Sequence, residues 1–123
     1  MAGPDIVCKR IYADASPDDG YRVLIDRLWP RGFSKQSAGI DHWARELAPS
    51  NSLRKQFNHQ PERWPEFCRR YAEELAGQGA AMQMLLEKTQ QQRLTLLYAA
   101  RNTEHNNAVA FAHILQHFCS NKP

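Results

Sequence analysis

Two clusters of residues in this chain have side chains that could bind an anion or transfer a proton. The first cluster lies within YRVLIDRLWPRGFSK and contains Asp26, Arg27, Trp29, Arg31 and Gly32. The second lies at and after the end of LTLLYAA and contains Tyr98, Asn102, His105 and Asn106. An arginine presents a planar fork that holds a carboxylate or a phosphate with two hydrogen bonds. We therefore expect a binding site for a small anion, carried by these residues.

Asp26 and His105 are the candidates for acid–base catalysis. An unperturbed imidazole titrates near neutral pH, so His105 is the better general base, and Asp26 either orients it or acts as the base itself. Tyr98 would donate a hydrogen bond to a bound oxyanion, and Gly32 would let backbone N–H groups approach it. The chain has no Walker A loop and no GxGxxG motif, so nothing indicates a nucleotide in particular.

A purely structural role for the same residues stays open. In that alternative Asp26 pairs with Arg27 or Arg31 to fix the loop, Trp29 packs against its surroundings, and His105 hydrogen-bonds to solvent.

Three segments predict the β-strands that would position the two clusters, namely 6–12, 21–29 and 94–100. In the second segment Val23 and Ile25 would occupy one face and Leu24 the other, and the third segment alternates in the same way. Strands that are apolar on both faces are typical of the middle of a sheet covered by helices. Ligands bind at the carboxyl edge of a parallel sheet, so parallel neighbours would bring both clusters into one cleft.

Apolar residues at helical spacing predict helices over 61–75, 80–88 and 104–118, the last with Thr103 as its N-cap. Ser50 would cap a shorter helix that contains Leu53 and Phe57. Helices between strands predict the α/β class. We expect one domain over residues 1–123, a small three-layer α/β/α sandwich with a mostly parallel central sheet and helices on both faces.

The segments HWARELAPS and FNHQPERW are dense in aromatic residues and prolines. They predict either a rigid lid over the sheet edge, with Arg54 and His59 facing the cleft, or a well-packed loop region without a binding role.

The composition is that of a globular protein. Of 123 residues, 42% are hydrophobic and 24% are charged, and no apolar run approaches the roughly 20 residues of a membrane span. The three cysteines are widely spaced without a CxxC motif, and the first residues contain no apolar signal segment. We therefore expect reduced thiols, a cytoplasmic location and no membrane partner.

The net charge of +3 is too small to create a general field for nucleic acid. Within 21–35, four cations accompany the single acid Asp26, which predicts a focused positive site. We expect no sequence-specific nucleic-acid binding, because neither the 61–75 nor the 104–118 helix is a basic recognition helix. A transcriptional regulator and a protein-interaction module using Trp43 and Trp64 are the rival hypotheses, and the oligomeric state is left open.

His113, His117 and Cys119 have a spacing that zinc could use. No second ligand-rich segment accompanies them, so we expect no metal and no cofactor.

Four segments together resemble the YeaO-like branch of the family called domain of unknown function 488. They are DRLWPRG, ELAPS, LRKQFNHQPERWPEFCRRYAEEL and LTLLYAARNTEHNNA, and the likeness runs from residue 6 to about residue 118. The resemblance implies a compact α/β sandwich of bacteria and archaea and no particular activity. Some relatives in the wider group have a Cys-His-Arg triplet after the last strand, where this chain has His105, Asn106 and Asn107. Thiol chemistry at that loop is therefore not expected.

Overall fold

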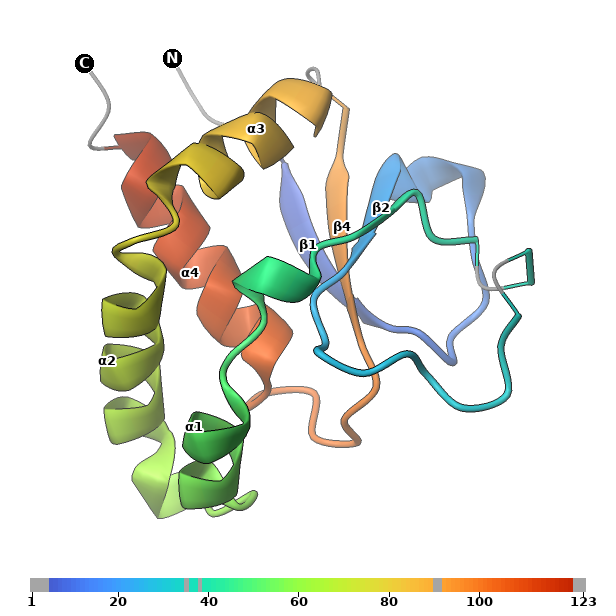
Figure 1. Cartoon of the computed structure of the whole chain (residues 1–123). Coiled ribbons are helices and arrows are strands. Elements are labelled where there is room, and N and C mark those ends of the chain that lie inside the picture. The colour runs from blue at the N-terminus through green and yellow to red at the C-terminus, as the bar shows by residue number, and fades with distance from the viewer. Residues whose placement is uncertain (1–4, 35, 38, 90–91, 121–123) are drawn as a thin grey trace.

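A parallel β-sheet forms the centre of the protein (Figure 1). The computed structural model describes residues 5–34, 36–37, 39–89 and 92–120. Within them lie the four strands β1 (Ile6–Arg10), β2 (Tyr21–Leu24), β3 (His42–Trp43) and β4 (Leu94–Tyr98). The strand order is β1-β4-β2-β3, and every neighbouring pair is parallel. The predicted α/β class with a parallel sheet is therefore confirmed.

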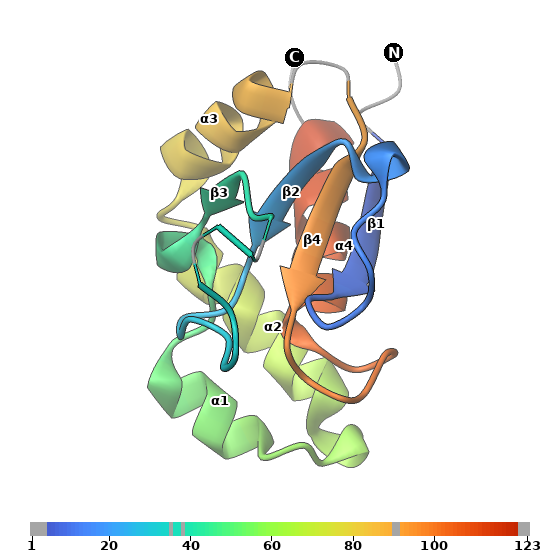
Figure 2. The same cartoon turned by 90° about the vertical axis from the view of Figure 1, so that its right-hand side faces the viewer.

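Four α-helices cover one face of this sheet (Figures 1 and 2). They are α1 (Asn51–Phe57), α2 (Trp64–Leu75), α3 (Gly79–Thr89) and α4 (Asn107–Ser120). Val23 and Ile25 point into this layer together with Leu96, because alternate residues of a strand share one face. The core that results also contains Tyr71 of α2 and Phe111 of α4, both fully buried.

The other face of the sheet is covered by connecting segments, which corrects the expectation of helices on both faces. Leu24 and Leu97 pack there with Ile11 of the β1–β2 connection and with Trp29 of the β2–β3 connection. Figure 2 looks onto this face and shows the connections crossing in front of the strands. Residues 11–20 join β1 to β2, a length at the lower limit of the roughly 10–12 residues that a crossover with a full helix needs. The segment instead contains the 3-10 helix η1 (Pro17–Asp19).

The two central strands are buried as predicted. Leu24, Ile25, Leu96 and Leu97 have no exposed surface, and β2 and β4 are neighbours in the sheet. The strand predicted over 21–29 is shorter, because β2 ends at Leu24 and Leu28 is 65% exposed. Ile25 still donates its N–H to the Leu97 carbonyl at 3.1 Å, so the hydrogen bonding between the two chains continues one residue beyond the end of β2.

Most helices agree with the prediction, and the start of the last one does not. The 61–75 segment forms the 3-10 helix η3 (Pro61–Arg63) followed by α2, and Ser50 caps α1 by accepting the Leu53 N–H at 3.1 Å. The last helix was expected from 104 with Thr103 as cap, yet α4 begins at Asn107, and the Asn106 side chain accepts the Val109 N–H at 2.9 Å. The preceding residues form a turn around Asn102, which competes with a helix there.

Two further short elements were not expected from the sequence. They are β3 and the 3-10 helix η2 (Arg45–Leu47), which follow one another at the sheet edge. Among the described residues, no helix has both the length and the apolar character needed to cross a membrane.

Gly20 lets β2 enter the sheet beside the chain that leads into β4. Its φ is +66°, and a Cβ at this position would lie 2.2 Å from the Arg93 carbonyl oxygen. That carbonyl also accepts the Tyr21 N–H at 2.8 Å, so it cannot move away without breaking the first hydrogen bond of the strand.

We expect Gly20→Ala to lower the free energy of unfolding by at least about 1–3 kcal/mol, the cost of a strained backbone conformation, with the overlap adding to it. Gly77→Ala is the matched control, because a Cβ there meets nothing within 4 Å and its φ is not in the left-handed region. Urea denaturation of both variants measures the difference. Equal stability of the two variants would show that the Arg93 carbonyl does not constrain Gly20.

Candidate ligand-binding cavity

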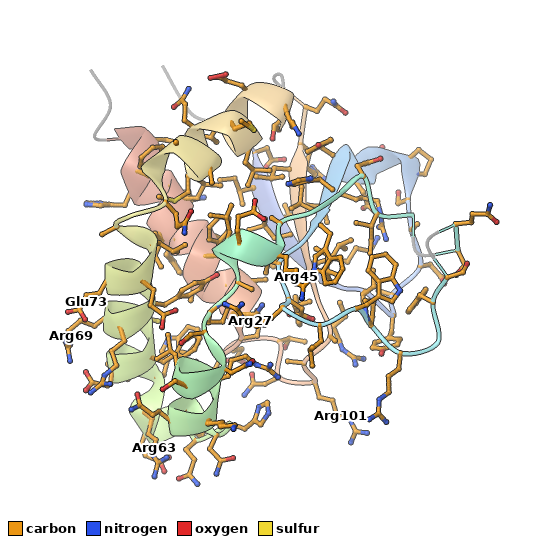
Figure 3. All side chains as sticks on the ribbon, viewed as in Figure 1. Arg27, Arg45, Arg63, Arg69, Glu73 and Arg101 are labelled. Atoms are coloured by element: carbon orange, nitrogen blue, oxygen red, sulfur yellow. The ribbon has the colours of Figure 1, made fainter. Side chains whose placement is uncertain are left out.

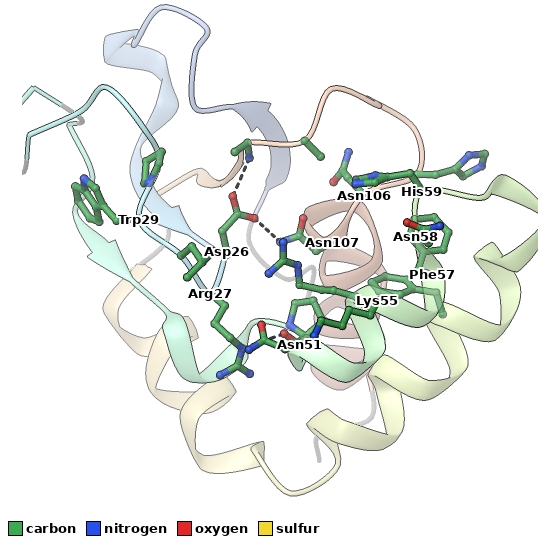
Figure 4. Close-up of a pocket in the computed structure, with 18 of the residues that line it drawn as sticks. Asp26, Arg27, Trp29, Asn51, Lys55, Phe57, Asn58, His59, Asn106 and Asn107 are labelled. Carbon is green, nitrogen blue, oxygen red and sulfur yellow. Dashed lines mark hydrogen bonds between the residues drawn. The ribbon is translucent and has the colours of Figure 1, made fainter.

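A cavity of about 590 Å³ opens at the carboxyl ends of β2 and β4 (Figure 4). Its walls come from the loop after β2, from α1, and from the turn that leads into α4. Its volume lies within the usual range for sites that hold a small molecule. The cavity therefore occupies the edge of the parallel sheet at which the sequence predicts a cleft.

The structure brings most of the predicted site residues to this cavity. Those that line it are Asp26, Arg27, Trp29, Arg31, His105 and Asn106. They come from two segments about 75 residues apart in the sequence, which meet because parallel strands end on the same side of the sheet. Their roles in binding or catalysis stay predictions.

Three predicted site residues lie elsewhere. Tyr98 is only 3% exposed and packs in the core. Asn102 uses its side-chain oxygen to accept the N–H groups of Glu104 and His105, at 2.9 and 3.0 Å. Gly32 has a φ of +85° and open space where a Cβ would be, so its turn requires glycine for backbone conformation alone.

Asp26 is fixed by hydrogen bonds from two different elements. Its carboxylate accepts the Ala99 N–H at 2.9 Å and the Asn107 side-chain amide at 2.8 Å (Figure 4). The same Asn107 amide donates to the Ile25 carbonyl at 2.8 Å. Within the described part of the chain, no ion pair joins Asp26 to Arg27 or Arg31. The carboxylate is thus held by Ala99 and Asn107 instead of by the arginines that the structural alternative names.

Burial raises the pKa of the Asp26 carboxyl above its ordinary value. The hydrogen bonds from Asn107 and Ala99 and the positive charge of Arg54 act in the opposite direction. Removal from water is the larger effect. Asp26 therefore ionises at some cost, and a donor placed near it would reduce that cost.

Arg27 lies half-buried in the cavity wall and donates to two neutral carbonyl groups. Its Nε contacts the Pro49 oxygen at 3.2 Å and its Nη2 contacts the Ala48 oxygen at 3.4 Å. These bonds hold the segment before α1 against the loop after β2. Arg31 is exposed at the rim, where its backbone oxygen accepts the Tyr12 hydroxyl at 3.3 Å.

Helix α1 adds a polar wall that was only partly expected. The residues that it and its C-cap direct to the cavity are Asn51, Arg54, Lys55 and Asn58. They follow the spacing i, i+3, i+4, i+7, which puts them on one face of a helix, while Leu53 and Phe57 are buried. The polar stripe in NSLRKQFN is the sequence signal for this wall. His59 also lines the cavity, as the lid hypothesis predicted for Arg54 and His59.

The positive charge of the site is distributed differently from the sequence-based expectation. Arg22 is buried and pairs with Asp19, and Lys35 lies outside the described residues. The charges that reach the cavity come instead from the loop after β2 and from α1. Among the residues that the structure describes, the cationic side chains that line it are Arg27, Arg31, Arg54 and Lys55, and the acidic one is Asp26.

His105 packs against Trp64, with ring centroids 4.9 Å apart. Trp64 in turn stacks on Phe67 at 5.6 Å, so the imidazole is attached to the aromatic core between α1 and α2. Between described residues, no hydrogen bond joins His105 to Asp26. The two predicted catalytic residues thus face one cavity without acting on each other directly.

His113, His117 and the three cysteines are not among the described residues that line this cavity. Within the described ranges, no three His, Cys, Asp or Glu side chains are grouped so that they could hold a metal ion. Burial raises the pKa of the Cys8 thiol to about 11, and burial also raises the pKa of Cys68. Both thiols are therefore protonated at neutral pH, as expected for packing residues.

Comparisons with known proteins identify relatives of the chain. The model of a family described as the inactive DUF488-N3 subclade matches residues 5–122. The uncharacterized protein YeaO of Escherichia coli K12 is 43% identical over 108 residues, which are 88% of this chain and 94% of YeaO. The uncharacterized proteins Mb3100c of Mycobacterium bovis and Rv3073c of Mycobacterium tuberculosis are each 42% identical over 106 residues, 86% of this chain and 89% of theirs. No solved structure matches the chain significantly.

We expect Asn107→Ala to lower the free energy of unfolding by about 1.5–3 kcal/mol, because it removes a hydrogen bond to a charged group and leaves the Ile25 carbonyl without its donor. Asn51→Ala is the control, since Asn51 is an exposed amide on the same cavity. Chemical denaturation should show a change within about 0.5 kcal/mol for that control. Similar losses in both variants would contradict the role given to Asn107.

The raised pKa of Asp26 also predicts how stability depends on pH. The folded state retains this proton to higher pH than the unfolded state does, so the free energy of unfolding falls as pH rises from about 4, the ordinary pKa of an aspartate. The slope for one proton is at most about 1.4 kcal/mol per pH unit. Asp26→Asn should remove this contribution, which urea denaturation from pH 4 to pH 7 would measure as a difference in slope. Parallel curves for the two proteins would be evidence against it.

Proposed function

The chain belongs to the inactive DUF488-N3 subclade, and from this premise we propose that it is a binding protein whose cavity holds a small anion. The anion would carry a phosphate or carboxylate group. The description of the subclade as inactive favours binding over catalysis for this chain.

One observation carries the proposal: among the described residues, four cationic side chains and one acid line the same cavity. Like charges that converge on a confined, partly desolvated space repel each other, and the repulsion grows as the local dielectric constant falls. A bound anion would relieve this repulsion. The positive wall would also attract anions from solution.

The cations are held on defined elements, which supports a specific site. Arg27 is anchored by two carbonyl groups, and Arg54 and Lys55 project from a capped helix. Asn106 and Asn107 place the N-terminus of α4 at the same cavity, where its helix dipole favours negative charge. Little rearrangement would be needed on binding.

The rival functions have less support. In a nucleic-acid-binding regulator the arginines of α2 would have to be available, yet Arg69 and Arg70 pair with Glu66, and Arg69 also pairs with Glu73 (Figure 3). We therefore still predict no sequence-specific binding of nucleic acid.

An interaction module would have to expose the tryptophans named for it. Trp43 is half-buried and donates its indole N–H to the Asp26 carbonyl at 2.7 Å. Trp64 packs between Phe57 and His105. An enzyme on a small metabolite stays the second candidate, with Asp26 and His105 in the acid–base roles predicted for them.

Titration with inorganic phosphate, followed by NMR chemical shifts and calorimetry, tests the anion site. We expect shifts confined to the cavity, and Arg54→Gln should weaken binding by about 10–100-fold, the equivalent of losing one hydrogen bond to a charged group. Lys88→Gln removes the same charge from the exposed surface of α3 and should leave the affinity unchanged. Equal weakening in both variants, or no binding by the wild type, would refute the site.

A further inference from the structure

We propose that the ligand of this cavity is amphoteric: its anionic group lies against Arg54 and Lys55, and a hydrogen-bond donor of the same molecule reaches the Asp26 carboxylate. This inference rests on the anion site proposed above and specifies the chemical class of its ligand. That class comprises small zwitterions such as amino acids and amino-substituted phosphate esters.

A site for a simple anion would have no need of a carboxylate such as that of Asp26. Asp26 is the one acid among the described residues that line the cavity, and it lies amid cations that would otherwise favour any anion. A carboxylate there weakens the binding of a ligand that carries only negative charge. A ligand with an ammonium or another N–H donor beside its anionic group would be attracted by both parts of the site.

The hydrogen bonds of Asp26 leave room for such a donor. An ionised carboxylate has about four acceptor positions on its two oxygens. The bonds from Ala99 and Asn107 fix the orientation of the group and occupy one position on each oxygen. The carboxylate is thus held rigidly by the protein and faces a cavity where a ligand can complete its coordination.

We assign the anionic end of the ligand to α1 because its cations are exposed, whereas Arg27 already donates hydrogen bonds to the protein. Arg27 directs two of its N–H groups to the Pro49 and Ala48 carbonyls, whereas Arg54 and Lys55 are exposed to the cavity. Arg54 is near enough to Asp26 for its charge to act on that carboxyl. Figure 4 shows Lys55 on α1 and the Asp26–Asn107 pair on the side of the sheet.

The size and lining of the cavity fit a metabolite larger than a bare ion. About 590 Å³ exceeds what phosphate alone would fill, and Phe57, Phe67 and Trp29 provide apolar surface for a carbon skeleton. A polyphosphate would fill the volume but would bring its negative charge close to Asp26. An amphoteric ligand satisfies the charges and the apolar surface together.

Matched phosphate esters test the inference on the intact protein. O-phosphoethanolamine is compared with ethyl phosphate, and 3-aminopropyl phosphate with propyl phosphate, by calorimetric titration at pH 7. A cavity that responds only to charge would prefer the alkyl esters, because their net negative charge is larger. We expect the reverse, with at least one amino ester binding tenfold or more tightly than its alkyl partner.

The variants Asp26→Asn and Lys88→Gln then test whether Asp26 causes the preference for amino esters over alkyl esters. We expect Asp26→Asn to abolish it and to tighten the binding of ethyl phosphate, and Lys88→Gln to change neither. If both alkyl esters bind at least as tightly as the amino esters to the wild type, the inference is overturned while the anion site stands. If none of the esters binds, both proposals fail. A preference that survives in Asp26→Asn would remove Asp26 from the inference, and the wild-type comparison decides the ligand class even if that variant does not fold.

Discussion

Hydrogen bonds to Asp26 join several of the elements beside the cavity. Its carboxylate accepts a hydrogen bond from Ala99, just after β4, and another from Asn107, the first residue of α4. Its backbone carbonyl accepts the Trp43 indole N–H, which attaches the edge strand β3. One residue thus joins the end of the central strand pair, the edge of the sheet and the start of a helix. Burial raises the pKa of this carboxyl, so the junction has an electrostatic cost that only well-placed donors offset.

The parallel sheet explains why that junction lies beside a cavity. Parallel strands present all their following segments at one edge, and here the segments after β2 and β4 diverge. The first crosses the face that carries Leu24 and Leu97, and the second turns toward the helical face and becomes α4. The space between them is closed by α1, which is tied to the loop after β2 through the Arg27 hydrogen bonds. The cavity is a consequence of this divergence, and its polar lining combines residues that follow the two strands with the polar stripe of α1.

Much of this arrangement could be predicted from the sequence, because its signals are strong and local. Leu24, Ile25, Leu96 and Leu97 indicated two central strands. The polar residues that follow these strands converge as long as the strands are parallel neighbours.

The features that the sequence did not predict depend on side chains that compete for backbone hydrogen bonds, or on contacts between distant elements. The Asn102 amide captures two backbone N–H groups and delays the last helix until Asn107. A two-residue strand such as β3 has no periodicity of its own and is formed by pairing with β2. The α1 wall was detectable as a polar stripe, yet its orientation toward the cavity depends on the burial of Leu53 and Phe57.

The excess positive charge of the chain can be compared with the charges that line the cavity at this edge of the sheet. Removing the four cavity cations from the sixteen of the chain leaves twelve, and removing Asp26 from the thirteen acids also leaves twelve. The net charge of +3 is therefore equal to the excess carried by the described residues that line the cavity. Among the described residues, ion pairs elsewhere join Lys9 and Arg22 to Asp19, Arg93 to Asp5, and Arg69 and Arg70 to glutamates of α2. Local pairing of this kind leaves a protein with little long-range field. For the proposed ligand, recognition would therefore act at short range, through contacts with the cations and with the Asp26 carboxylate that line the cavity.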